Sequence, residues 1–241
     1  MGIKFALGEN PKSYYTERDD APQTRMATAA LIREALEKAR RYMVLTERAE
    51  EPEDLPDYDI KCEALIPLLK GEVKAHIHCH RADDIMTALR ICKEFGLKPL
   101  LVHCTEGHLI ADLLGEAHAE AVVGPIICDR GKPELAHASL ENAGKLCAAG
   151  VKTAICTDHP ETPINFLTAG AAYCCKYGMP KNEALKGLTI TAAELGGFAD
   201  RTGSVTVGKD ADLILLDGDP FEIMTNVCMT MINGKIVFER K

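Results

Sequence analysis

Short apolar runs alternate along the chain with segments whose apolar residues recur at helical spacing. From residue 73 onward the two patterns take turns, which indicates βαβ units and a parallel sheet. The pattern alone does not separate a closed barrel from a doubly wound sheet. The predicted strands are 73–79, 100–103, 121–123 and 151–156, and the predicted helices are 82–95, 107–116, 139–149, 163–177 and one or two within 181–195.

The first 70 residues are less regular. Residues 3–7 predict a short strand, and the polar residues 12–23 predict a loop. A long run of good helix formers predicts a helix over 24–47, with Thr24 as its N-cap. The acidic, Pro-containing stretch 48–58 predicts a loop, and 62–69 a shorter helix that contains Pro67.

The last 40 or so residues follow a different pattern. The Asn233-Gly234 pair stands between two apolar runs, which is a strong signal for a β-hairpin. We therefore predict an α/β domain over 1–200 and a separate β segment over 201–241.

Composition narrows the class of protein. The chain is 46% hydrophobic and 27% charged, with no Trp, so an aliphatic core is expected. A net charge of -8 argues against nucleic acid as a partner, and the absence of a long apolar stretch argues against a membrane. Ten cysteines without a Cys-x-x-Cys pair, and an N-terminus without an apolar leader, predict a cytoplasmic protein with reduced thiols.

Candidate metal ligands follow three of the predicted strands. His76, His78 and His80 alternate along one strand and so share a face, while His103 and Asp158 stand at the ends of two later strands. In parallel α/β folds, active sites lie at the carboxyl ends of strands. Imidazole and carboxylate groups gathered there suit Zn²⁺ or another divalent ion, which would activate water.

The sequence suggests a different role for each of these residues. We predict His78, His103 and Asp158 as metal ligands, with Asp158 also as general base. His103 and His80 are candidates to polarise the substrate carbonyl. The other histidines are assigned to the core (His76) or to the surface (His118 and His137), and the predicted substrate contacts are Arg81, His108 and His159.

Two of the substrate assignments have alternatives. Two interpretations of Arg81 are open: it binds a substrate carboxylate, or it pairs with Asp83 and Asp84. Two interpretations of His108 are open as well: it contacts the substrate, or it caps a helix.

The same segments resemble the amidohydrolase superfamily, in particular its imidazolonepropionase-related and prolidase-like members. The resemblance rests on residues 78–85, 103–108 and 157–160, on Leu7–Lys12 with Thr24–Met26, and on the tail 203–214. It implies a (β/α)₈ barrel with one or two divalent metals. It also implies that His78, His103 and Asp158 match the ligands of strands 5, 6 and 8, and that Lys4 matches the strand 4 lysine, with Glu9 as an alternative carboxylate.

The resemblance also implies that the chain corresponds to about strands 4 to 8 of the barrel and to the second part of a small β-sandwich. The His-x-His of strand 1 has no counterpart here. A partial barrel would expose open strand edges, so we predict either self-association into a homo-oligomer or a complementing chain that supplies the missing strands.

The leading hypothesis is a metal-dependent hydrolase that cleaves a carbon–nitrogen bond in a small molecule, either a cyclic amide or a dipeptide-like substrate. A second hypothesis is a catalytically inactive half-barrel that acts by assembly. A third is a metal-free enzyme with Cys104 or Cys156 as nucleophile, although thiols in apolar strands are usually inert.

Overall fold

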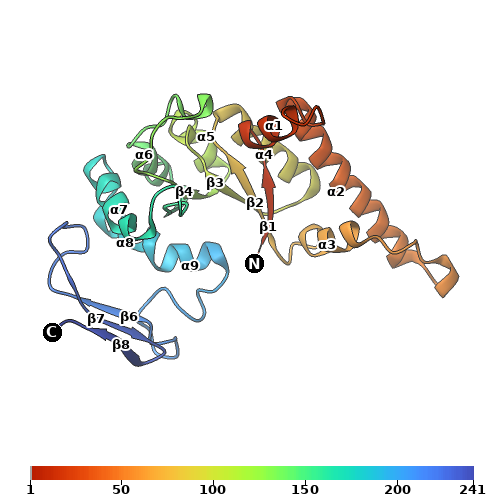
Figure 1. Ribbon diagram of the computed structural model, residues 1–241. Coiled ribbons are helices and arrows are strands. Elements are labelled where there is room, and N and C mark those ends of the chain that lie inside the picture. The colour runs from red at the N-terminus through yellow and green to blue at the C-terminus, as the bar shows by residue number, and fades with distance from the viewer. Residues whose placement is uncertain (1) are drawn as a thin grey trace. The chain divides into compact units, whose positions relative to one another are not determined.

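The computed structural model describes residues 2–241, which form two compact units divided between Val102 and His103. The first unit contains a strand, two helices, a third helix and then a β–α–β repeat (Figure 1). Its elements are β1 (Gly2–Ala6), α1 (Glu9–Thr16), α2 (Arg25–Arg48), α3 (Ile60–Leu69), β2 (Lys74–Cys79), α4 (Ala82–Phe95) and β3 (Pro99–His103).

The second unit begins at the last residue of β3 and contains two further strands of the parallel sheet, five helices and an antiparallel sheet. Its elements are α5 (Ala111–Glu116), β4 (Glu120–Val123), α6 (Asn142–Ala148), β5 (Lys152–Ile155), α7 (Leu167–Lys176), α8 (Lys181–Leu188), α9 (Ile190–Gly196), β6 (Leu213–Leu216), β7 (Val227–Ile232) and β8 (Lys235–Glu239).

The order of the strands distinguishes between the two α/β architectures. The parallel sheet runs β1-β2-β3-β4-β5, so each strand is added beside the one before it in the sequence. A doubly wound sheet instead reverses direction at a switch point. Sequential addition is the topology of a (β/α)₈ barrel. The predicted partial barrel is therefore confirmed, as an open five-stranded sheet over the described residues.

Local chemistry explains most element boundaries in the first unit. Thr24 caps α2 by accepting a hydrogen bond from the backbone N–H of Ala27, as predicted. Asp59 accepts from the N–H groups of Lys61 and Cys62, so α3 begins two residues earlier than the pattern predicts. Helix α4 covers the predicted range and ends at Gly96, which adopts a left-handed conformation.

The predicted loop over 12–23 is wrong for residues 12–16, which belong to helix α1. Proline usually ends a helix, but Pro11 lies in the first helical turn, where the missing N–H has no intrahelical partner to lose. Glu9 in that turn also interacts favourably with the helix dipole. Helix α1 follows β1 directly and so places these residues next to the end of the strand.

Two predicted helices of the second unit are interrupted. The range 107–116 divides into a 3₁₀ turn at Gly107–Leu109 and helix α5, and 163–177 divides into a 3₁₀ turn at Ile164–Phe166 and helix α7. The helix predicted over 139–149 is not interrupted but begins later than predicted, at Asn142. Apolar periodicity does not distinguish 3₁₀ from α geometry at helix starts, so the sequence did not show these breaks.

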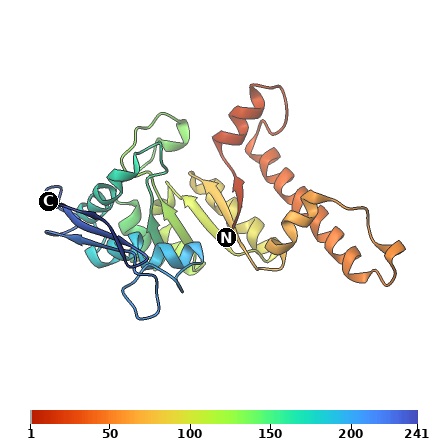
Figure 2. The ribbon, with the colours of Figure 1, turned by 60° about the horizontal axis from the view of Figure 1, so that its bottom comes forward.

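The antiparallel sheet β6-β7-β8 lies in the tail, drawn in blue in Figures 1 and 2. Asn233 and Gly234 connect β7 to β8 with φ angles of 49° and 74°. Positive φ at both central positions belongs to the type I′ turn that Asn-Gly favours. The predicted hairpin is confirmed, while the domain boundary at residue 200 stays a prediction.

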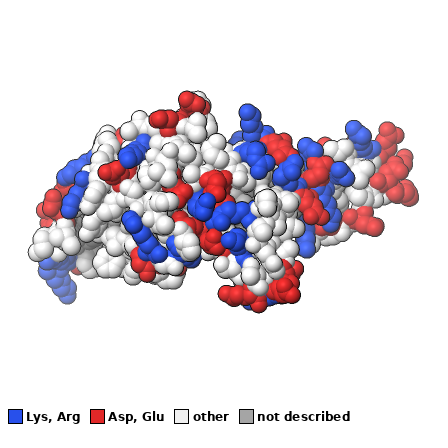
Figure 3. Space-filling view, turned by 90° about the horizontal axis from the view of Figure 1, so that it is seen from above, with Lys and Arg blue, Asp and Glu red and all other residues white. Residues whose placement is uncertain are grey.

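Basic and acidic side chains are interspersed on the face of the molecule that Figure 3 shows. Exposed acidic residues cluster in the loop between α2 and α3, at Glu50, Glu51, Glu53, Asp54 and Asp57. Within residues 2–241, no helix combines the length and apolarity needed to cross a membrane.

Candidate metal centre

Three buried histidines come together at the carboxyl ends of neighbouring strands. His78 lies near the end of β2, His80 follows that strand, and His103 is the last residue of β3. One ring nitrogen from each lies within 4.8 Å of the others. The rings of His78 and His80 meet edge to face with centroids 4.7 Å apart, as residues two apart on one strand face should. This group of three imidazoles is the candidate metal centre.

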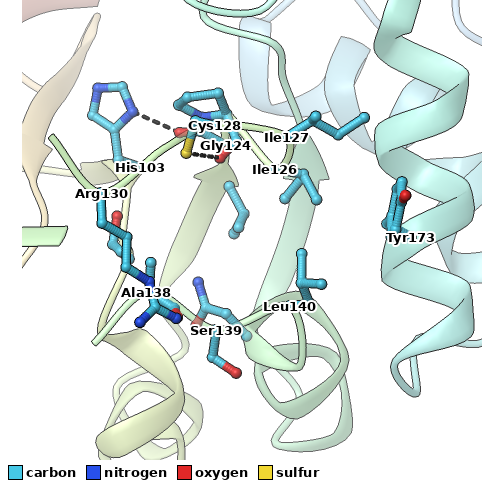
Figure 4. Close-up of a pocket in the computed structure, with 14 residues that line it drawn as sticks. His103, Gly124, Ile126, Ile127, Cys128, Arg130, Ala138, Ser139, Leu140 and Tyr173 are labelled. Atoms are coloured by element: carbon cyan, nitrogen blue, oxygen red, sulfur yellow. Dashed lines mark hydrogen bonds between the residues drawn. The ribbon is translucent and has the colours of Figure 1, made fainter. Parts of the chain in front are cut away.

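The ring of His103 is fixed by its other nitrogen. Nδ1 of His103 lies 2.6 Å from the carbonyl oxygen of Gly124, which follows β4 (Figure 4). Because a carbonyl only accepts, Nδ1 carries the proton and Nε2 keeps its lone pair. Metal-bound histidines usually donate their second N–H to such an acceptor. Nε2 of His103 is thus the nitrogen whose lone pair could bind an ion.

The other two histidines are equally buried, and His78 contacts a polar side chain. Its Nε2 lies 3.3 Å from the side-chain amide nitrogen of Asn10 in α1. The exposed fractions of His78, His80 and His103 are 6%, 5% and 3%. Neutral imidazole is the form that binds metals.

The three residues fit a divalent transition metal. Zinc–nitrogen bonds are about 2.0–2.1 Å long, so two nitrogens on a shared ion are at most about 4.2 Å apart. Donors within 4.8 Å of one another are close to that spacing. Three neutral nitrogen donors suit Zn²⁺ and similar ions rather than Mg²⁺ or Ca²⁺, which prefer oxygen.

Asp158 follows the end of β5 and is exposed, with a φ of 51°. Among the described residues, the group of possible metal ligands whose donor atoms all lie within 4.8 Å of one another includes His80 but not Asp158. Backbone hydrogen bonds from Glu161 to Asp158 and from Thr162 to Thr157 close the turn in which it lies. His159, the predicted substrate contact, is exposed in the same turn. Asp158 therefore has the accessibility that a proton acceptor needs.

The structure answers some of the questions that the sequence left open. Arg81 pairs with Asp83, with nitrogen–oxygen distances of 3.0 and 2.9 Å. Lys4 is exposed in the middle of β1, in register with His76 of β2. Burial lowers the pKa of His76, and the positive charge of Lys4 lowers it further.

The loop after β3 is organised by a residue that the sequence did not single out. Asn142, buried at the start of α6, accepts a hydrogen bond from the backbone N–H of His108 and donates one to the carbonyl of Cys104. The ring Nδ1 of His108 lies 3.2 Å from the carbonyl oxygen of Thr105. Asn142 and His108 are far apart in sequence, so no local pattern indicated this bridge.

His137 is exposed, as the sequence predicts, but it has a partner that the sequence did not indicate. Its Nδ1 lies 2.9 Å from a carboxylate oxygen of Glu106. Glu106 is buried in the loop after β3. The pairing joins that loop to the segment that follows β4.

Cys104 is not suited to act as a nucleophile. It is fully buried, and burial raises the pKa of its thiol to about 12. Only the thiolate attacks, and almost none is present at neutral pH. The hypothesis of a metal-free enzyme with a cysteine nucleophile therefore loses Cys104 as a candidate.

A cavity of about 330 Å³ lies beside His103, formed entirely by the second unit (Figure 4). Apolar side chains from the segment after β4, including Ile126, Ile127 and Leu140, line much of it. Tyr173 of α7 faces it from the other side. Arg130 also lines it, and one of its nitrogens donates to the carbonyl of Ala138 at 2.8 Å. The cavity has the size and lining of a small-molecule site.

Gly124, which positions His103, offers a direct test. A Cβ there would stand 2.0 Å from the carbonyl oxygen of Cys156, and its φ is 144°. We expect Gly124→Ala to lower the midpoint of thermal unfolding by several degrees and to weaken metal binding, because the carbonyl that holds His103 must move. Differential scanning calorimetry and metal titration measure the two effects.

Gly150→Ala is the matched control. Gly150 also has a positive φ, of 83°, but a Cβ there would meet no atom within 4 Å. It should cost only the backbone strain, about 1 kcal/mol, and leave metal affinity unchanged. Equal metal affinities in the two variants would contradict the role given to Gly124.

The described geometry agrees with comparisons to known proteins. The family model described as "Amidohydrolase family" matches residues 69–237, which include β2, β3, β4 and β5 with the strand ends discussed above. The chain belongs to the amidohydrolase family. A crystal structure of an amidohydrolase from Thermotoga maritima superposes with a TM-score of 0.92 and 40% sequence identity, over 99% of this chain and 63% of that one.

Curated relatives give the same assignment. The amidohydrolase tasK of Hapsidospora irregularis is 29% identical over 98% of this chain and 26% of its own length. The imidazolonepropionase of Maricaulis maris is 36% identical over 37% of this chain and 23% of its own length. This amidohydrolase chain thus spans about a quarter of those relatives and less than two thirds of the Thermotoga protein.

Proposed function

We propose that this chain is the part of a metal-dependent hydrolase that binds a divalent ion and cleaves a carbon–nitrogen bond other than an ordinary peptide bond. The observation that carries the proposal is the buried group of His78, His80 and His103 at the ends of neighbouring strands. Membership of the amidohydrolase family supports hydrolysis as the reaction class.

Each residue has a defined task in the proposed reaction. His78, His80 and His103 would hold the ion through neutral nitrogens. When bound there, a divalent ion would lower the pKa of water to roughly 7 and so supply a nucleophile at neutral pH. Asp158 accepts the proton of the attacking water and returns it to the leaving nitrogen. Its exposed position after β5 allows it to meet both water and substrate.

The substrate we propose is a small amide with an apolar group next to the scissile bond, cyclic or dipeptide-like. The evidence for the apolar group is the apolar lining of the cavity beside His103. The names of similar proteins support the bond: one is an imidazolonepropionase, and another is the N-substituted formamide deformylase of Arthrobacter pascens, 29% identical over 43% of this chain.

Metal removal followed by a substrate panel tests this function. The protein is dialysed against a chelator and assayed with cyclic amides, N-substituted formamides and Xaa-Pro dipeptides, before and after Zn²⁺, Co²⁺ or Mn²⁺ is restored. We expect hydrolysis of at least one class, lost without metal and regained with it. Hydrolysis that persists in metal-free protein would contradict the proposal, as would metal-loaded protein inert towards all three classes.

We further propose that the active form contains β structure beyond the sheets described here, from a second copy of the chain or from a complementing chain. The support lies in β8, where Ile236, Val237 and Phe238 are 54%, 56% and 49% exposed. Successive strand residues point to opposite faces, so both faces present apolar side chains to solvent.

Analytical ultracentrifugation tests the assembly. We expect a mass above the 26.2 kDa of one chain, reduced by Phe238→Lys but not by Glu239→Lys on the same strand. A soluble, monodisperse 26.2 kDa species would show that the exposed apolar faces need no partner.

A further inference from the structure

The segment Gly8–Pro11 and the pair Thr24-Arg25 carry part of the family resemblance, yet the proposed reaction assigns them no task. In the structure they form the start of α1 and the start of α2. Backbone pairing fixes where α1 begins, because Ala6 lies opposite His78 in the sheet and the N–H of Leu7 donates to the carbonyl of His78 at 2.9 Å. The first turn of α1 is therefore next to a candidate metal ligand.

Asn10 in that turn contacts the imidazole directly. Its amide nitrogen lies 3.3 Å from Nε2 of His78. With the amide placed as observed, its N–H donates to the lone pair of Nε2, and the proton of the neutral ring is on Nδ1. After a half-turn of the Asn10 amide, its oxygen accepts from Nε2–H instead, and the lone pair of His78 is on Nδ1. The second pairing is the one that leaves a lone pair on the nitrogen of His78 that Asn10 does not contact.

A chain of ion pairs holds α1 in this position. Glu9, beside Asn10, accepts from Arg25 of α2 at 2.9 Å, and Arg25 in turn donates to Asp84 of α4 at 3.0 Å. The side chain of Asp84 is only 3% exposed. Its carboxylate is costly to bury without a cation, so Arg25 is strongly held there. Arg25 thereby ties the first turn of α1 to the helix that follows His80.

We propose that Asn10 is a positioning residue of the metal centre, which fixes the tautomer and ring orientation of His78 while the chain Glu9–Arg25–Asp84 holds its helix in place. This inference rests on the proposed metal-binding function. It also explains why Glu, Asn and Arg occur together at these positions: one aligns the ligand and the other two align the helix that carries it.

The test compares Asn10→Ala and Asn10→Asp, with Ser13→Ala, one turn later on α1 and exposed, as the control. Two readouts are used: the tautomer of His78 in metal-free protein, from histidine-ring ¹H–¹⁵N NMR, and Zn²⁺ affinity in competition with a chromogenic chelator. We expect Asn10→Ala to mix the tautomers and to weaken Zn²⁺ binding about 10- to 100-fold. Asn10→Asp keeps an acceptor and should retain the Nε2–H tautomer.

Glu9→Gln weakens the half-buried pair with Arg25, together with the Glu9–Lys12 pair on the same helix, and should shift the NMR signals of His78 in the same direction as Asn10→Ala. Wild-type tautomer and Zn²⁺ affinity in Asn10→Ala would overturn the role of Asn10. A wild-type His78 spectrum in Glu9→Gln would overturn the role of the ion pairs. If the unaltered protein bound no Zn²⁺, the proposed function would fail while the tautomer measurement on metal-free protein would still decide this inference.

Discussion

Replacing His103 with asparagine is expected to remove most of the bound metal and to lower kcat/KM by about a thousandfold or more. Asparagine is chosen because His103 has a φ of 74°, a conformation that Asn tolerates better than Ala. The substitution removes one of three donors, and a site with two histidines holds an ion weakly. Losing about 4 kcal/mol of stabilisation from the ion corresponds to a thousandfold in rate.

His118→Asn provides the matched control. His118 also has a positive φ, of 48°, but it is exposed just before the start of β4, at the opposite end of the strands from the candidate centre. Metal content by elemental analysis and steady-state kinetics should be unchanged in this variant. A His103→Asn protein that keeps one ion per chain and its activity would remove His103 from the centre.

Replacing Asp158 with asparagine is expected to lower kcat by about 10²- to 10⁴-fold while the metal stays bound. Loss of a positioned general base costs a factor of this size. Asparagine has nearly the same shape and tolerates the φ of 51° at this position, so the turn should be preserved. Because Asp158 lies outside the group of donors within 4.8 Å, the three histidines should retain the ion.

Metal content separates the two roles considered for Asp158. If Asp158→Asn loses both metal and activity, Asp158 acts as a ligand; if it loses activity alone, it acts as the proton acceptor. Asp112→Asn, exposed in the first turn of α5, controls for the loss of one negative charge. Unchanged kcat in Asp158→Asn would contradict the proposed acid–base chemistry.

The βαβ region was predicted from the sequence to within a few residues. Helix α4 ends before Gly96, β3 begins at Pro99, and both elements have clear apolar periodicity, as does β2, so local physics determines them. Helix α1 was missed because Pro11 has opposite meanings in a loop and in a first helical turn. The position of the histidines together at the strand ends was also predictable. Strand periodicity fixes the face of the sheet to which each side chain points, and parallel topology brings the strand ends to one edge.

The contacts that organise the site were not predictable from the sequence. Gly124 is joined to His103 through a backbone carbonyl, which carries no side-chain signature. Asn10 reaches His78 across the β1–β2 pairing, and Glu106 meets His137 across two loops. Each contact depends on tertiary packing between segments far apart in the chain. Residue types thus indicate where a site lies, while its hydrogen-bonded surroundings require the three-dimensional structure.

We propose that His78, His80 and His103 jointly bind one divalent ion. Anomalous X-ray diffraction from crystals grown with Zn²⁺, recorded at the zinc absorption edge, tests it most directly. We expect one strong anomalous peak about 2.0–2.1 Å from nitrogens of all three histidines, with Nδ1 of His78 and Nε2 of His103 as the ligating atoms. A peak elsewhere in the protein, or no peak among these three rings, would contradict the account.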